Sequence, residues 1–170
     1  MEIGSREWQH LIIDGAQQLG IAIDKRISAM FAAYAAELIH WNRKINLTAI
    51  TDPRDIAIKH FLDSLAPAQF IPDRVRLLDI GSGAGFPGIP LKIFKPSLSV
   101  LLIDGTLDRL PDDLVAEILE RLMAKDSPWT LLVTTGRRAV MAACQRVVAL
   151  QPDVLADKGN KGERYRLKKV

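Results

Sequence analysis

The chain has 170 residues, of which 48% are hydrophobic and 25% charged, a composition typical of one soluble globular domain and not of a disordered or fibrous protein. Cys144 is the only cysteine, which excludes an intrachain disulfide and a cysteine-based zinc site. All of the net charge of +3 lies in residues 151–170. The longest apolar stretch, Ile27 to Ile39, is too short and too polar to span a bilayer. With no signal peptide read at the N-terminus, we expect a cytoplasmic protein.

The first seventy residues predict three helices. The first covers residues 7–19 and ends at Gly20, because glycine commonly terminates helices. The second begins near Lys25 and carries an apolar stripe at three- and four-residue spacing. The third begins at Asp52-Pro53, an N-cap carboxylate followed by proline, and ends near Leu65. The stripe of the second helix consists of Ile27, Met30, Phe31, Tyr34, Leu38 and Trp41.

Short apolar runs then alternate with helical segments. The runs are residues 75–80, 99–103, 129–135 and 146–150, and helices are expected at 88–94, 112–124 and 137–143. This alternation is typical of βαβ units. We therefore predict an α/β fold, a Rossmann-like three-layer sandwich with a short, mostly parallel sheet of four to five strands. The tail from Gln151 is either a final strand at 164–170 or a disordered end, and we favour the strand.

We expect one compact domain with four parts. These are a helical segment at residues 1–72, a βαβ start at 73–104, a βα completion at 105–150 and a basic tail at 151–170.

A glycine-rich turn follows the first predicted strand. Residues 79–88 read DIGSGAGFPG, with Gly81, Gly83 and Gly85 at alternate positions. Glycine lets a ligand approach the main chain closely, and free N–H groups at a helix start attract polar or anionic groups. Asp104 ends the second strand, where an acidic residue binds ribose hydroxyls in nucleotide-binding folds. The turn thus favours a nucleoside-containing ligand, although a tight turn without a ligand has the same glycine spacing.

Three motifs resemble the RsmG (GidB) family. They are Asn46-Leu47-Thr48-Ala49-Ile50, Lys59-His60-Phe61-Leu62-Asp63-Ser64, and residues 79–91. Members of this family transfer a methyl group from S-adenosylmethionine to a guanine ring nitrogen in small-subunit ribosomal RNA. The resemblance covers residues 1–104 and implies a class I methyltransferase that binds S-adenosylmethionine. It assigns cofactor contacts to Gly81, Ser82, Gly83, Gly85 and Phe86, and the ribose to Asp104, and it leaves the catalytic residues unknown.

Residues 100–150 resemble the C-terminal part of an ABC-transporter ATPase domain. Val100–Asp104 is similar to its Walker B strand, Leu107-Asp108 to its D-loop, and residues 130–135 and 146–150 to later strands. Gly105 and Gly136 replace two residues that ATP hydrolysis requires, and no phosphate-binding G-x-x-x-x-G-K-[ST] loop is found. We therefore expect no ATPase activity.

Together, the two resemblances suggest a chimera, designed or fused. Its expected function is that of an α/β scaffold without complete catalytic machinery, in which S-adenosylmethionine binding is weak or lost. The alternative is an active, shortened 16S ribosomal RNA guanine-N7 methyltransferase, which would bind RNA. A third hypothesis is an RNA-binding module that uses the basic tail. No membrane partner is expected, and the chain is predicted to be a monomer or a homodimer.

Other chemistry-bearing residues have ordinary interpretations. His60 and Asp63 lie one helical turn apart and either pair beside the turn or form a buried latch. No metal site is expected, because His10 and His40 have no ligands at suitable spacing. Trp8 and Trp41 lie on apolar helix faces and are expected to pack in the core, the alternative being stacking platforms for bases. The remaining candidates are Cys144, expected to be a small buried side chain, and Arg137-Arg138, either anion-binding or solvated.

Overall fold

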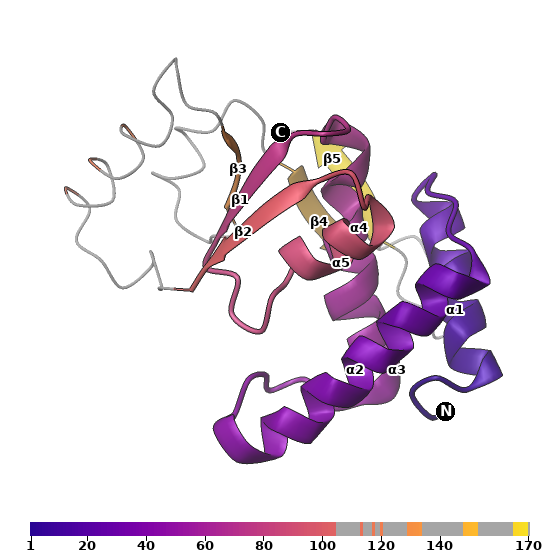
Figure 1. Cartoon of the computed structure of the whole chain (residues 1–170). Helices are drawn as coiled ribbons and strands as arrows, with labels where there is room; N and C mark the ends of the chain where they lie inside the picture. The colour runs from indigo at the N-terminus through magenta and orange to yellow at the C-terminus, as the bar shows by residue number, and fades with distance from the viewer. Residues whose placement is uncertain are drawn as a thin grey trace.

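The computed structural model describes residues 1–104, 113, 117, 120, 129–133, 148–152 and 165–169. Its first part is helical (Figure 1), with α1 at Arg6–Gln18 and α2 at Lys25–Ile45. Ser5 and Asp24 cap these helices by accepting hydrogen bonds from backbone N–H groups three residues later. Gly20, with φ of +74°, follows α1 at the predicted stop. The first two predicted helices are therefore confirmed.

The third helical segment begins where the sequence predicts and then departs from an α-helix. Asp52 accepts hydrogen bonds from two N–H groups and caps α3, Pro53–Asp55. The chain continues as a π-helix, η1, at Ile56–Leu62, then as α4 at Asp63–Leu65 and a 3₁₀ segment, η2, at Ala66–Phe70. The π-helix was not predicted, and its i→i+5 bonds change which side chains share a face.

A parallel sheet follows, as predicted. It consists of β1 at Arg76–Ile80, β2 at Ser99–Ile103 and β3 at Trp129–Val133, in the order β2-β1-β3. Helix α5, Gly88–Phe94, connects β1 to β2. The register pairs Ile80 of β1 with Ile103 of β2. The carboxyl ends of β1 and β2 therefore lie side by side, where ligands bind in such sheets.

The predicted count of four to five strands in one sheet is not confirmed. Strands β4, Val148–Pro152, and β5, Tyr165–Lys169, form a separate antiparallel pair in the described residues. The favoured tail strand at 164–170 matches β5 in position. Other predictions lie outside the described residues, namely the helices at 112–124 and 137–143 (except for Asp113, Glu117 and Glu120), Gly105, Leu107-Asp108, Gly136, Arg137-Arg138 and Cys144.

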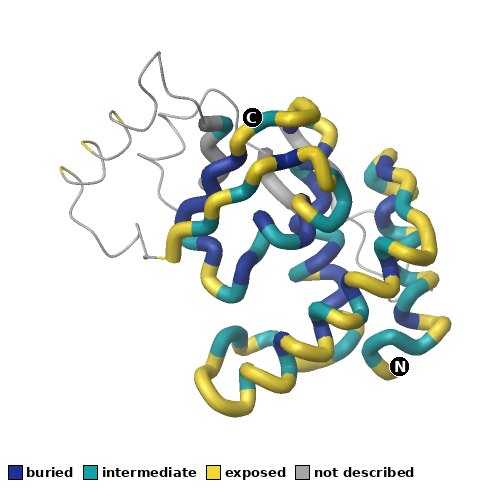
Figure 2. The backbone as a smooth tube through the Cα atoms, in the orientation of Figure 1, coloured by how far each residue is buried: buried dark blue, intermediate teal, exposed yellow. Residues whose placement is uncertain are grey.

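One hydrophobic core joins the helical segment to the sheet. Phe61 lies at its centre, with ring centroids 5.8 Å from Trp8 and 4.9 Å from Phe31. Leu77 of β1 and Leu91 of α5 belong to the same buried cluster, and Figure 2 shows buried stretches in both the helical segment and the sheet. The helical segment is thus packed on the βαβ unit. In the described part of the chain, no helix is long and apolar enough to cross a membrane.

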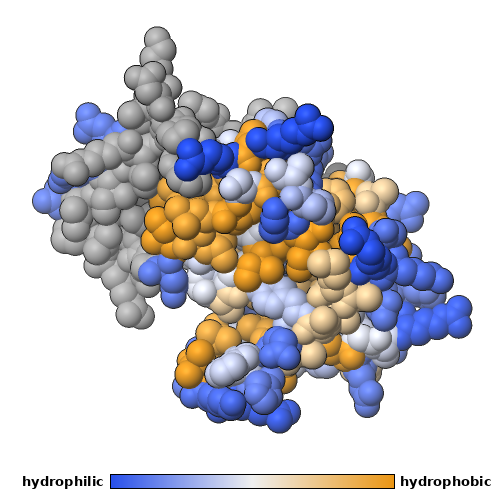
Figure 3. Space-filling view, viewed as in Figure 1, coloured by the Kyte–Doolittle hydropathy of each residue, from blue (hydrophilic) through white to orange (hydrophobic). Residues whose placement is uncertain are grey.

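Strand β2 keeps an apolar face in contact with solvent. Leu101 is 45% exposed and Ile103 is 44% exposed, and Figure 3 shows hydrophobic surface in this region. Leu102, on the opposite face, is half-buried. The exposed face ends at the carboxyl end of the strand, next to the glycine-rich turn.

Candidate functional site

The glycine-rich turn leaves β1 in a conformation that glycine favours. Gly81, Gly83 and Gly85 have φ angles of +78°, +52° and +99°. Gly81 donates its N–H to the Ile103 carbonyl at 2.8 Å, which anchors the turn to the end of β2. Gly85 donates to the Ser82 carbonyl at 2.8 Å. The turn is therefore held by its own backbone, and positive φ angles explain three of its glycines.

The glycines of the turn serve two different purposes. A Cβ atom at Gly81 or Gly83 would meet no atom within 4 Å, so their main chain borders open space. A Cβ atom at Gly85 would lie 2.3 Å from Ile89, and one at Gly88 would lie 2.3 Å from Leu102. The turn is thus closely packed on one side and open on the other, and Gly81 and Gly83 form its open part.

Asp79, in β1, holds the end of the turn through a hydrogen bond. Its side chain is fully buried, and its Oδ2 accepts a hydrogen bond from the Gly88 N–H at 2.8 Å. Its Oδ1 is buried and has no hydrogen-bond partner among the residues that the structure describes. Burial raises the pKa of Asp79 to about 6, and the Gly88 hydrogen bond opposes the increase. A buried carboxylate oxygen without a partner is costly, and such groups cluster at functional sites.

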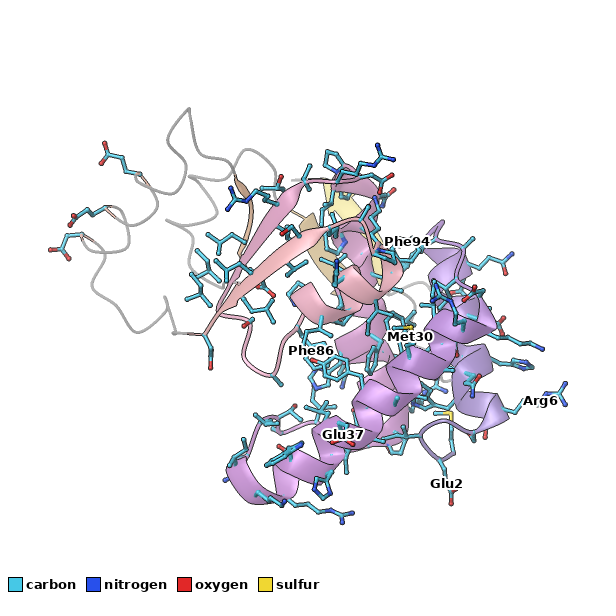
Figure 4. The ribbon with its side chains drawn as sticks, in the orientation of Figure 1. Glu2, Arg6, Met30, Glu37, Phe86 and Phe94 are labelled. Atoms are coloured by element: carbon cyan, nitrogen blue, oxygen red, sulfur yellow. The ribbon has the colours of Figure 1, made fainter. Side chains whose placement is uncertain are left out.

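Phe86 connects the turn to the helical segment. Its ring stacks on Tyr34 of α2, with centroids 5.0 Å apart, and on His60 of η1, with centroids 4.6 Å apart. Figure 4 shows Phe86 lying between the turn and α2. The Tyr34 hydroxyl donates a hydrogen bond to the Ala84 carbonyl of the turn. Burial, together with the charge of Asp79, raises the pKa of Tyr34 well above its usual range.

His60 has a different partner from the one that the sequence suggested. Its Nε2 lies 2.9 Å from the Thr48 Oγ1, and no hydrogen bond joins it to Asp63 among the described residues. Pairing of His60 with Asp63 was therefore wrong, whereas its position beside the turn was right. Burial lowers the pKa of His60. Burial also raises the pKa of Asp63 to about 6, opposed by the charge of Lys59.

Thr48 and Tyr34 also belong to the site, although Thr48 was noted only as part of a family motif and Tyr34 only as part of an apolar stripe. Thr48 accepts a hydrogen bond from the Ile50 N–H at 3.0 Å and, through its own N–H, donates to the Asn42 Oδ1 at 2.8 Å. These bonds fix the loop after α2 against His60. A tyrosine on an apolar stripe was the available signal, because a buried hydroxyl needs a hydrogen-bond partner.

The other predicted site residues are placed as follows. Asp104 follows β2 directly and is exposed, one residue beyond the carbonyl that anchors Gly81. Ser82 is buried. The structure therefore brings all six candidates, Gly81, Ser82, Gly83, Gly85, Phe86 and Asp104, to one end of the β1–β2 pair. Within the described residues, no group of three or more metal-ligating side chains comes together.

The arrangement combines features that suit a nucleoside-containing ligand. Gly81 and Gly83 offer main chain that a ligand can approach, and Asp104 offers an exposed carboxylate for hydroxyl groups. Asp79 places a buried acceptor beneath the turn.

Comparison with known proteins identifies a methyltransferase family whose matched region includes this site. The family model described as GidB, rRNA small subunit methyltransferase G, matches residues 27–112. A ribosomal RNA small subunit methyltransferase G of Roseiflexus castenholzii is 53% identical over 127 residues, which are 74% of this chain and 52% of the relative. The Acetivibrio thermocellus protein of the same name is 44% identical over 117 residues, which are 68% of this chain and 48% of the relative.

The similarity covers only part of each relative. The corresponding Geobacter metallireducens protein is 48% identical over 100 residues, which are 59% of this chain and 46% of the relative. The chain thus spans about half the length of the curated relatives that it matches. The matched family region includes the glycine-rich turn, Thr48, His60 and Asp104, and it ends at residue 112. The resemblance of residues 100–150 to an ATPase is not shown by these comparisons.

Proposed function

The chain belongs to the GidB family, rRNA small subunit methyltransferase G, and from that premise we propose that it transfers a methyl group from S-adenosylmethionine to guanine N7 of small-subunit ribosomal RNA. One observation carries the proposal. The glycine-rich turn presents open main chain at Gly81 and Gly83, above a buried Asp79 oxygen without a partner and beside the exposed Asp104. The relatives named above are methyltransferases by name.

The residues at the turn fit S-adenosylmethionine. The main chain of Gly81, Ser82 and Gly83 would contact the cofactor, and the Asp104 carboxylate would accept hydrogen bonds from its ribose hydroxyls. Gly85 would serve the packing of the turn and not the cofactor, because a Cβ atom there would lie 2.3 Å from Ile89. Phe86 would also act as a positioning residue, since its ring stacks on Tyr34 and His60.

The proposed methyl transfer needs no general base from the protein. When bound, S-adenosylmethionine supplies an electrophilic methyl group on a sulfonium. Guanine N7 carries a lone pair and no proton, so no general base has to remove one. Catalysis can then come from alignment of the two reactants, which is worth several orders of magnitude in rate. The turn is held by the hydrogen bond from Tyr34 to Ala84 and by the stacking of Tyr34 and His60 on Phe86, which suits that task.

Isothermal titration with S-adenosylmethionine tests the cofactor site. We expect saturable binding by the full chain and weaker binding by Asp104→Ala, because the variant lacks the ribose acceptor. Asp14→Ala removes an exposed carboxylate of α1 and is the matched control. No heat with folded protein at millimolar cofactor would refute the proposal. Transfer of a radiolabelled methyl group to small-subunit RNA then tests the reaction.

Cofactor binding without methyl transfer is the second candidate function. It corresponds to the chimeric scaffold suggested by the ATPase-like segment at 100–150. Binding in the titration together with no radiolabel in the RNA would support this candidate. Methyl transfer would exclude it and establish an active methyltransferase.

A further inference from the structure

His60 joins two parts of the chain that lie far apart in the sequence. Its ring stacks on Phe86 of the glycine-rich turn, with centroids 4.6 Å apart and ring planes 15° apart. Its Nε2 lies 2.9 Å from the Oγ1 of Thr48, in the loop after α2. One side chain thus contacts both the turn and the loop, so the position of its ring affects both.

The backbone that carries His60 is unusual. His60 lies in the π-helix η1, and π-helical turns occur frequently at functional sites. Phe61, the next residue, is fully buried, whereas His60 is half-buried. His60 therefore lies at the edge of the core, where its ring can exchange protons with the solvent while it packs against Phe86.

The hydrogen bonds at Thr48 favour one form of the His60 ring. The Thr48 Oγ1 already accepts a hydrogen bond from the Ile50 N–H at 3.0 Å. Its own hydroxyl hydrogen is satisfied when His60 Nε2 accepts it, which requires a neutral ring with the proton on Nδ1. A charged ring carries protons on both nitrogens, so the Thr48 hydroxyl would need another acceptor. The hydrogen bonds found among the described residues give it none.

The surroundings of His60 also disfavour its charged form. Burial lowers the pKa of the ring. The ion pairs formed within the described part of the chain do not include His60. The titratable groups on the elements packed around the stacked rings are Lys59 and Asp63 on the same helical segment, Tyr34 on α2 and Asp79 on β1. The neutral ring is therefore the form that this site stabilises.

We propose that His60 is a positioning residue whose neutral ring, hydrogen-bonded to Thr48, holds Phe86 and the turn in the arrangement that binds the ligand, and that protonation of the ring weakens this arrangement. The inference rests on the proposed function for the identity of the ligand, S-adenosylmethionine. It adds that cofactor binding depends on the charge of a side chain that acts through Phe86. The loss of one hydrogen bond corresponds to about ten-fold in affinity.

NMR of the full chain without cofactor tests the positioning role directly. At neutral pH, the ring nitrogen shifts of His60 should report the Nδ1–H form, with the two exposed histidines of the chain as internal references. On acidification, the amide signals of Gly81 and Gly83 should shift with the same pKa as the His60 ring. In Thr48→Val, the pKa of His60 should rise, because the neutral ring loses the hydroxyl that donates to it.

Calorimetry with S-adenosylmethionine tests the effect on binding. On acidification through the His60 pKa measured by NMR, the affinity of the unaltered chain should fall about ten-fold more than that of His60→Gln. Glutamine keeps a neutral acceptor for Thr48 at every pH. The difference between the two chains isolates His60, because Asp63 and Asp79 titrate near pH 6 in both. His10→Gln, at an exposed histidine of α1, is the matched control and should keep the full pH dependence.

The two measurements separate this inference from the proposed function. An Nε2–H ring at neutral pH, or Gly81 and Gly83 signals that do not follow the His60 titration, would overturn the inference whether or not the cofactor binds. Signals that follow His60 in a chain that binds no cofactor would support the positioning role and refute the proposed function. Cofactor binding with the same pH dependence in His60→Gln as in the unaltered chain would overturn the inference and support the proposed function.

Discussion

Substitution of Asp79 tests whether its buried charge lowers the stability of the chain. Its carboxyl group is fully buried, with one oxygen bonded to the Gly88 N–H and the other without a partner. Asp79→Asn keeps an amide oxygen for the Gly88 bond and removes the charge. We expect this variant to be more stable than the unaltered chain at neutral pH and to bind S-adenosylmethionine less well.

The size of the effect follows from the pKa of Asp79. Burial raises this pKa from 3.8 to about 6, so between these values the folded chain binds a proton that the unfolded chain has released. The free energy of unfolding therefore falls as the pH rises through this window. Each pH unit is worth about 1.4 kcal/mol, which gives a cost of about 3 kcal/mol at pH 7. Asp79→Asn avoids this cost.

Urea unfolding at two pH values measures the difference. At pH 7, Asp79→Asn should gain up to about 3 kcal/mol, or roughly 6–12 °C in Tm for a chain of this size. At pH 4.5 the gain should shrink to about 1 kcal/mol, because fewer unfolded carboxyl groups are ionised there. Asp14→Asn, on the exposed face of α1, should change neither value. A variant that is less stable than the unaltered chain at pH 7 would refute the reasoning.

Three further predictions concern the turn and its supports. Gly85→Ala should lower the free energy of unfolding in urea by about 3 kcal/mol, and Gly83→Ala by only about 1 kcal/mol. Both glycines have a positive φ, but only a Cβ atom at Gly85 would collide with neighbouring atoms. Equal losses in the two variants would contradict this packing. Tyr34→Phe should lower the free energy of unfolding by about 1 kcal/mol in the same assay, because its hydrogen bond to the Ala84 carbonyl is lost. An unchanged free energy of unfolding would show that this hydrogen bond does not form. His60 should titrate below 6.5 by NMR, because burial disfavours its charged form, and a pKa above 6.5 would contradict its burial.

Much of the fold could be predicted because its signals are local. Asp52 caps its helix as the sequence predicted, and Ser5 and Asp24 cap the two earlier helices in the same way. The apolar runs at β1 and β2 and the glycine-rich turn between them follow the pattern of a βαβ unit. The parallel sheet was predicted on this basis. Antiparallel pairing of β4 with β5 was not, because strand pairing depends on contacts distant in the sequence.

In the helical segment, the spacing of apolar residues predicts some buried side chains correctly and others wrongly. The stripe on α2 predicts a buried face, and Phe31 and Leu38 lie on it as expected. Trp41 continues the stripe but is exposed, because the spacing of apolar residues does not reveal how far the neighbouring elements extend. His60 illustrates a second limit, since the π-helix changes the faces that an α-helical spacing assumes, and Thr48 takes the place of Asp63 as its partner.

The helical segment and the glycine-rich turn are joined by direct side-chain contacts. Tyr34 and His60 contact the turn through Ala84 and Phe86, so displacing either helix would disturb the open main chain at Gly81 and Gly83. A substitution that displaces α2 is therefore expected to weaken ligand binding at the turn without contacting the ligand itself.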